Sequence, residues 1–158
     1  MVLLMFYWVA LIVFAADQIS KLFVRLLMNV GETHTVKQGV LQFIYLQNSG
    51  AAGSTFQGYG RWFGILAAII VIGIIYYREV MLKSRPRVLD FGLGMLAAGA
   101  AGNGIERLVY GKVTDFIAFG SGRGSMNLAD LAINIGVLII IVYSLFFSKQ
   151  WKQKHTVS

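Results

Sequence analysis

Residues 127–147 read NLADLAINIGVLIIIVYSLFF, and this stretch decides the fold. No charge follows Asp130 until Lys149, so the run approaches the ~20 apolar residues that a bilayer crossing needs. Asn127, followed three residues later by Asp130, resembles a helix N-cap with an acid in the first turn. The stretch therefore predicts a membrane helix that begins beside a carboxylate.

Three further apolar runs indicate that the chain crosses the membrane four times. They extend from Val2 to Ala16 and on to about Met28, from Trp62 to Tyr77, and from about Val88 to Ile105. No basic residue precedes Lys21, so we expect the first run to be a retained helix rather than a cleaved signal peptide. The chain is expected to form one polytopic membrane domain over residues 1–158, with spans at about 3–28, 61–78, 88–106 and 128–147.

The composition supports contact with lipid. Hydrophobic residues make up 57% of the chain and charged residues 13%, which is too few charges to cover a water-facing surface. The net charge of +7 comes from clusters between apolar runs, so it does not indicate a nucleic-acid partner. The chain has no cysteine, which excludes disulfides and thiol nucleophiles, and its two histidines are too far apart to predict a metal site.

The basic residues orient the predicted helices. They gather in the loop after the second run and in the C-terminal tail, which the positive-inside rule places in the cytoplasm: Arg78, Lys83, Arg85, Arg87, Lys149, Lys152 and Lys154. Both termini are then cytoplasmic, and the segments at about 29–60 and 107–127 are extracytoplasmic. β-prone runs at 36–46 and 113–119 predict a small extracytoplasmic β element. The expected fold class is an all-α membrane protein with four transmembrane helices and this β element.

Four of the seven acidic residues map to the outer end of the predicted helices. Glu79 and Asp90 balance charge near the inner loop, and Glu32 lies in an outer loop as a solvated residue. Acids at membrane depth are costly unless they are paired or wetted, so the other four are candidates for function: Asp17, Glu106, Asp115 and Asp130.

Asp115 and Asp130 form the sharper pair. A glycine-rich stretch separates them and can fold back, so both carboxylates could meet at the outer membrane boundary. Two close carboxylates do not both ionise easily, and a pair that shares one proton can activate a water and protonate a leaving amine. The alternative for Asp130 is helix capping, and the two roles are compatible.

Other polar residues support two interpretations each. Asp17 and Lys21 lie on one helix face, either as part of a site or as a purely structural ion pair. Asn48 could hold a peptide backbone or simply form a turn, and Asn103 could do the same or join two helices.

Five motifs, in order, resemble those of the bacterial lipoprotein signal peptidases, also called signal peptidase II. Residues 17–21 (DQISK) are similar to D-Q-x-[ST]-K, and residues 48–52 (NSGAA) to N-x-G-A-A. Residues 102–107 (GNGIER) are similar to G-N-x-x-D-R, residues 113–116 (VTDF) to V-x-D-F, and residues 127–130 (NLAD) to N-x-A-D. The resemblance covers nearly the whole chain.

The resemblance implies an aspartic endopeptidase of the bacterial inner membrane with Asp115 and Asp130 as the catalytic dyad. Further residues are implied to bind substrate or support the site: Asn48, Gly50, Asn103, Arg107, Asn127, Asp17 and Lys21. The implied substrate is a diacylglyceryl-modified prolipoprotein, cut before the lipidated cysteine. Membrane lipid and a globomycin-type inhibitor are implied as further partners, a monomer is expected, and no cofactor or metal is implied.

Two positions depart from the family pattern. Glu106 replaces the usual aspartate, so its carboxylate reaches one methylene further. Gly53 stands where an aromatic residue commonly follows the double alanine, and either a looser sheet or Phe56 could compensate.

Two rival functions use the same features. A small proton-coupled membrane transporter could use the buried carboxylates, but it would place charges near mid-span rather than at one boundary. A structural membrane protein that binds a partner would tolerate asparagine at both Asp115 and Asp130.

Overall fold

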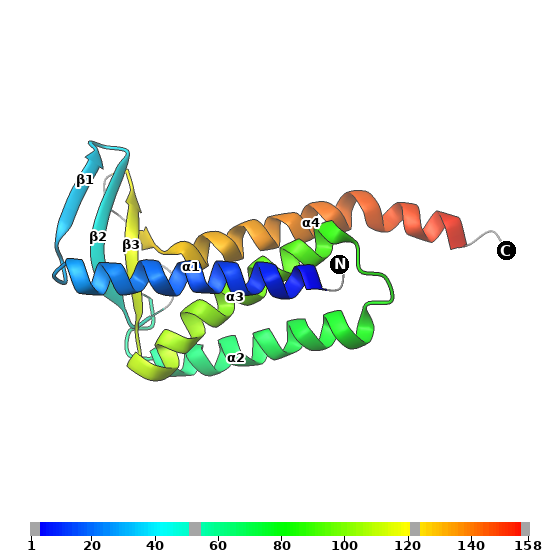
Figure 1. Cartoon of the computed structure of the whole chain (residues 1–158), viewed down its shortest axis with the longest axis horizontal. Coiled ribbons are helices and arrows are strands. Elements are labelled where there is room, and N and C mark those ends of the chain that lie inside the picture. Colours follow the sequence, from blue (N-terminus) through cyan, green and yellow to red (C-terminus); the bar gives the residue numbers. More distant parts are fainter. Residues whose placement is uncertain (1–3, 51–54, 121–123, 156–158) are drawn as a thin grey trace.

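The computed structural model describes residues 4–50, 55–120 and 124–155. Four α-helices dominate it (Figure 1): α1 (Met5–Leu27), α2 (Gly60–Tyr76), α3 (Arg87–Tyr110) and α4 (Leu128–His155). A π-helical turn, η3 (Tyr77–Met81), continues α2. Three stretches within the described residues are long and apolar enough to cross a membrane, namely Gly60–Met81, Arg87–Tyr110 and Leu128–Phe146.

The predicted class is confirmed in its coarser form, as a mostly helical membrane protein with a small antiparallel sheet. A crossing by α1 stays a prediction, because this helix carries buried Asp17 and Lys21 in its second half. The third predicted span was expected to end near residue 106, but α3 continues to Tyr110. It stops at Gly111, whose φ of +69° is a left-handed conformation that glycine adopts without strain.

Helix α3 is the centre of the bundle, and α1, α2 and α4 all contact it. Its small residues allow the close approach, which is typical of contacts between membrane helices. A Cβ added to Gly99 would lie 2.4 Å from the carbonyl oxygen of Ala129 on α4. On the facing helix, a Cβ at Gly136 would lie 2.7 Å from the Gly92 carbonyl oxygen. The α3–α4 contact is therefore set by backbone against backbone.

The predicted β element is a four-stranded antiparallel sheet in the order β1-β2-β3-β4. Its strands are β1 (Thr33–Lys37), β2 (Leu41–Asn48), β3 (Val113–Phe119) and β4 (Ser125–Met126). Strand β3 is buried along most of its length, whereas every residue of β1 is exposed. The sheet therefore has an inner side against the helices and an open outer edge.

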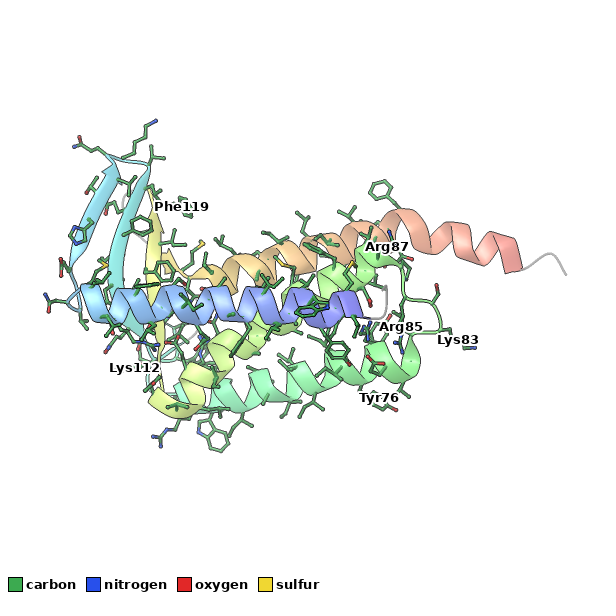
Figure 2. The ribbon with its side chains drawn as sticks, in the orientation of Figure 1. Tyr76, Lys83, Arg85, Arg87, Lys112 and Phe119 are labelled. Carbon is green, nitrogen blue, oxygen red and sulfur yellow. The ribbon has the colours of Figure 1, made fainter. Side chains whose placement is uncertain are left out.

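The sheet lies at one end of the helices (Figure 1), and the start of α1 lies at the opposite end with the far part of α4. Lys83, Arg85 and Arg87 are at that same opposite end, whereas Lys112 and Phe119 are at the sheet end (Figure 2). The basic loop and the sheet therefore lie at opposite ends of the helices, as the positive-inside rule predicts for a cytoplasmic loop and an extracytoplasmic sheet. The compartment that each end faces stays a prediction.

A buried ion cluster joins the helices at the end away from the sheet. The Arg78 side chain is 1% exposed and donates from Nη2 to Asp90 Oδ2 at 2.8 Å. Its guanidinium also lies over the rings of Phe6 and Tyr7 on α1, and it pairs with Glu79. The interpretation of Asp90 as simple charge balance is therefore incomplete, because its carboxylate is fully buried and fixes α3 to η3.

Gly53, for which a looser sheet or compensation by Phe56 was expected, lies outside the described residues. Phe56 does not fill a gap in the sheet, because its side chain is 70% exposed.

Candidate active site

A pocket of about 260 Å³ lies where the sheet meets the outer ends of α3 and α4. Six of the nine predicted site residues line it: Asn48, Asn103, Arg107, Asp115, Asn127 and Asp130. They come from β2, β3, α3 and the start of α4, so residues far apart in sequence converge on one space. The other three, Gly50, Asp17 and Lys21, lie behind the lining and reach it through hydrogen bonds.

Asp115 lies on β3 and is only 3% exposed. Antiparallel pairing with β2 brings Asn48 beside it, and Asn48 Nδ2 donates to Asp115 Oδ2 at 3.2 Å. Asn127 Nδ2 donates to the other oxygen at 2.7 Å. Burial, followed by the negative charge of Asp130, raises the pKa of Asp115 to about 6. This carboxyl can therefore hold a proton at a pH where an ordinary aspartate has lost it.

Asp130 is held by a reciprocal cap at the start of α4. The backbone N–H of Asn127 donates to Asp130 Oδ2 at 3.2 Å, and the backbone N–H of Asp130 donates to Asn127 Oδ1 at 3.0 Å. The predicted cap is confirmed. Asn127 thus holds Asp130 through its backbone and Asp115 through its side chain, so a single residue sets the relative positions of both carboxylates.

Asn103 connects Asp130 to a buried positive charge. Its Nδ2 donates to Asp130 Oδ1 at 2.7 Å, and its Oδ1 accepts a hydrogen bond from Lys21 Nζ at 2.8 Å. The alternative role of Asn103, joining helices, is also realised, since it bridges α1 and α4 from α3. Both hydrogen bonds fix the orientation of the amide, so the group that donates to Asp130 is determined.

Lys21 is fully buried and compensates two carboxylates. Its Nζ lies 2.8 Å from Asp17 Oδ2 and 3.1 Å from Glu106 Oε2. Asp17 Oδ1 in turn accepts the backbone N–H of Ala129 at 2.9 Å, which satisfies a free donor in the first turn of α4. The predicted ion pair therefore exists and also positions the helix that carries Asp130.

Glu106 connects the helices to the sheet. Its carboxylate accepts the Thr114 backbone N–H at 3.1 Å and the Thr114 hydroxyl at 2.9 Å, and it pairs with Arg25 at 2.6 Å. Thr114 precedes Asp115 on β3, so the longer side chain at 106 fixes the strand that carries the carboxylate. Thr114 is not among the predicted site residues. Because side chains alternate along a strand, Thr114 lies on the other face of β3 from Asp115, where it meets Glu106.

Arg107 lies over the ring of Phe63 at 5.9 Å, and its Nη2 donates to the Gly50 carbonyl oxygen at 3.1 Å. Its Nε is buried without a hydrogen-bond partner among the residues that the structure describes. Gly50 has no room for a side chain, since an added Cβ would lie 2.1 Å from the Thr55 carbonyl oxygen. The guanidinium is thus held at the pocket wall, and its Nε–H is available to a bound group.

Asn134 also lines the pocket, and the sequence analysis missed it. The available signal was its spacing, because residues four apart lie on one helix face and Asn134 follows Asp130 by four. No group of three or more histidines, aspartates or glutamates in the described part of the chain is placed to hold a metal ion.

The arrangement offers two carboxylates on the walls of one pocket, with amide and guanidinium donors around them. Such a pair can take a proton from water and give one to a leaving group, while the donors hold a polar backbone. Asp115 and Asp130 lie together at one end of the helices rather than along a path through the bundle.

The model of the family "Signal peptidase (SPase) II" matches residues 9–146. A lipoprotein signal peptidase of Synechocystis sp. is 38% identical over 145 residues, which cover 90% of this chain and 88% of that protein. One of Listeria welshimeri is 35% identical over 141 residues, which cover 87% and 91% respectively. A solved bacterial membrane enzyme superposes with a TM-score of 0.79 at 28% identity, covering 97% of this chain and 91% of that one.

Proposed function

The chain belongs to the signal peptidase II family, and on that premise we propose that it is an aspartic endopeptidase that removes signal peptides from diacylglyceryl-modified prolipoproteins. Family membership makes it a multi-pass membrane peptidase that acts in lipoprotein processing. The proposal adds the catalytic groups and the cut before the lipidated cysteine. The observation that carries it is the pocket in which Asp115 and Asp130 are joined through Asn127.

In the proposed reaction, Asp130 is the base and Asp115 the acid. Asp130 accepts two N–H groups and lies in the first turn of α4, where the helix dipole favours negative charge. It takes a proton from a water that attacks the scissile carbonyl carbon. Asp115, which has the raised pKa, gives its proton to the leaving nitrogen of the cysteine. The hydroxide that remains from the water adds to the carbonyl carbon, and the C–N bond breaks as the nitrogen takes its proton. The pair then carries its one proton on Asp130, and this proton returns to Asp115 before the next cycle.

The remaining residues have proposed supporting roles. Asn48 and Arg107 present donors at the pocket wall that can hold the substrate backbone, with Gly50 supplying the carbonyl that fixes Arg107. Asn103, Asp17 and Lys21 hold Asp130 and its helix from behind. The pocket at the sheet end supports an active site on the extracytoplasmic side of the cytoplasmic membrane, with both termini in the cytoplasm.

The location of the acids argues against proton-coupled transport. Asp115 and Asp130 line one pocket at the sheet end, and the buried Asp90 at the other end is neutralised by Arg78. A transport path needs groups near mid-span that are reached from both sides.

The test is a cleavage assay with purified protein and a diacylglyceryl-modified precursor peptide. Asp115→Asn and Asp130→Asn should each reduce kcat by roughly 10²- to 10⁴-fold, the range of a lost acid or base. Glu32→Gln is the matched control, because Glu32 is an acid at the sheet end outside the pocket, and this variant should retain normal turnover. Normal turnover in either aspartate variant contradicts the proposed dyad.

A further inference from the structure

Asn134 is a polar residue on an otherwise apolar part of α4. Between Asp130 and Lys149 it is the sole amide or charged residue of the sequence, and its neighbours Ile133 and Ile135 are apolar. Its side chain is exposed and makes no hydrogen bond within the described residues. An amide that has no protein partner at a pocket wall has both a donor and an acceptor free to pair with a bound substrate group.

The position of Asn134 points to a partner in the candidate active site. It lines the same pocket as Asp115 and Asp130. Four residues along α4 correspond to an axial rise of about 6 Å on the same helix face. Because α4 runs from the sheet end into the apolar region, the amide lies one turn deeper than the Asp130 carboxylate. A substrate group that pairs with it must therefore be close to the scissile bond and on its membrane side.

We propose that Asn134 is a specificity-determining residue, whose Nδ2 donates a hydrogen bond to an ester carbonyl of the diacylglyceryl group on the substrate cysteine. This inference rests on the proposed function. The lipid is joined to the cysteine through its sulfur, and a glycerol carbon separates that sulfur from the carbon bearing the nearer ester. An ester carbonyl can therefore lie roughly one helical turn, about 5.4 Å, from the scissile amide.

The ester fits the amide better than the signal peptide does. A signal peptide in lipid pairs its backbone groups within its own helix, whereas an ester carbonyl is an acceptor without any internal donor. Beyond Asn134, α4 presents the exposed apolar side chains of Leu138 (61%) and Ile141 (49%). The acyl chains can lie along these residues while the amide holds the ester at their head.

The test compares two synthetic lipopeptides of one sequence, carrying either two ester-linked acyl chains or two ether-linked alkyl chains. The assay uses a detergent without ester groups, so that bulk lipid cannot supply the carbonyl. For Asn134→Leu, we expect kcat/KM on the diester to fall roughly 5- to 20-fold, which corresponds to one hydrogen bond. The loss should lie mainly in KM, because the contact exists before the reaction begins. On the diether, variant and wild type should agree.

Two controls separate recognition from altered helix packing. Ile135→Leu changes the adjacent residue, which is exposed and outside the pocket, and should leave both substrates unaffected. Asn134→Gln keeps a donor and should recover part of the diester preference. An equal loss on both substrates, or no loss on the diester, overturns the assignment of Asn134.

The wild type alone provides a measurement that does not depend on how the variants fold. It should cleave the diester faster than the diether by a similar factor, and equal rates overturn the inference while leaving the peptidase function intact. Failure to cleave either lipopeptide overturns the proposed function, and the role of Asn134 with it.

Discussion

Asp115 shows how a β-strand can produce an acid from an ordinary aspartate. Burial on the strand and the negative charge of Asp130 both raise the pKa of the Asp115 carboxyl. The hydrogen bonds from Asn48 and Asn127 lower this pKa, but by less. The folded pKa of Asp115, about 6, lies above the ordinary value near 4, so the native state holds a proton that the unfolded chain has lost. The contribution of this carboxyl to stability therefore falls as pH rises from about 4 through about 6.

The same shift predicts a pH dependence of the reaction. If Asp115 is the acid, its proton is present below its pKa and absent above it, so kcat/KM should decrease as pH rises through about 6. The measurement is the kcat/KM profile of wild type on a lipopeptide whose own groups do not titrate in that range. A profile that instead rises through the same pH assigns Asp115 as the base and exchanges the proposed roles.

Among the elements, α3 and α4 pack closely because glycines at their contact leave no side chain between the two backbones. An added Cβ at Gly136 would lie 2.7 Å from the Gly92 carbonyl oxygen and 2.8 Å from the Leu96 backbone nitrogen. Backbone atoms cannot rotate away as a flexible side chain can, so the helices must separate to admit a methyl group. Gly73 on α2 offers the opposite case, because nothing lies within 4 Å of its added Cβ.

This contrast gives a matched pair of variants. Gly136→Ala should destabilise the protein by about 1–3 kcal/mol, the usual cost of overpacking, and should also reduce kcat because α4 carries Asp130. Gly73→Ala should be neutral or stabilising by up to ~1 kcal/mol, since alanine favours helix over glycine. Thermal unfolding in detergent and turnover report both effects. Equal behaviour of the two variants would contradict close α3–α4 packing as the device that positions Asp130.

The elements themselves were largely predictable from sequence. Apolar runs bounded by charges gave the helices, because hydrophobic length and charge placement are local properties of the chain. Helix α3 extends beyond the predicted end of the span at about 106, and Arg107 in this extension is held inside the protein by Gly50 and Phe63. The helix stops instead where Gly111 adopts a positive φ.

Six of the nine predicted site residues line one pocket, but the hydrogen bonds that connect them could not be predicted from the sequence. Motif order identified Asp115 and Asp130, but spacing could not show that Asn127 holds both of them. Nor could it show that Glu106 reaches β3 through Thr114, since that contact depends on how the sheet lies over α3. Asn134 was missed because a lone asparagine in an apolar run carries no motif.

At the scale of the whole molecule, the charges define two ends. Lys83, Arg85 and Arg87 lie away from the sheet, and Phe119 lies on it (Figure 2). The start of α1 is also away from the sheet (Figure 1), so four crossings with cytoplasmic termini are consistent with the arrangement. A three-crossing protein would place the start of α1 in the other compartment from the basic loop.

The absence of cysteine makes this topology testable by single labels. Phe119→Cys should react with a membrane-impermeant maleimide on intact cells, because Phe119 is 53% exposed at the sheet end. Lys83→Cys and Leu4→Cys should react only after the membrane is permeabilised. Labelling of Leu4→Cys on intact cells would show that α1 does not cross, and labelling of Lys83→Cys there would invert the whole orientation.

The reciprocal cap between Asn127 and Asp130 has a consequence for biosynthesis. The chain is made from its N-terminus, so β2 and β3, which carry Asn48 and Asp115, are synthesised before α4, which carries Asp130. Until α4 joins α3, a nascent chain holds one carboxylate and lacks the other. On the proposed mechanism, a chain whose last helix has not yet packed lacks the complete pair of carboxylates and therefore does not hydrolyse a peptide bond.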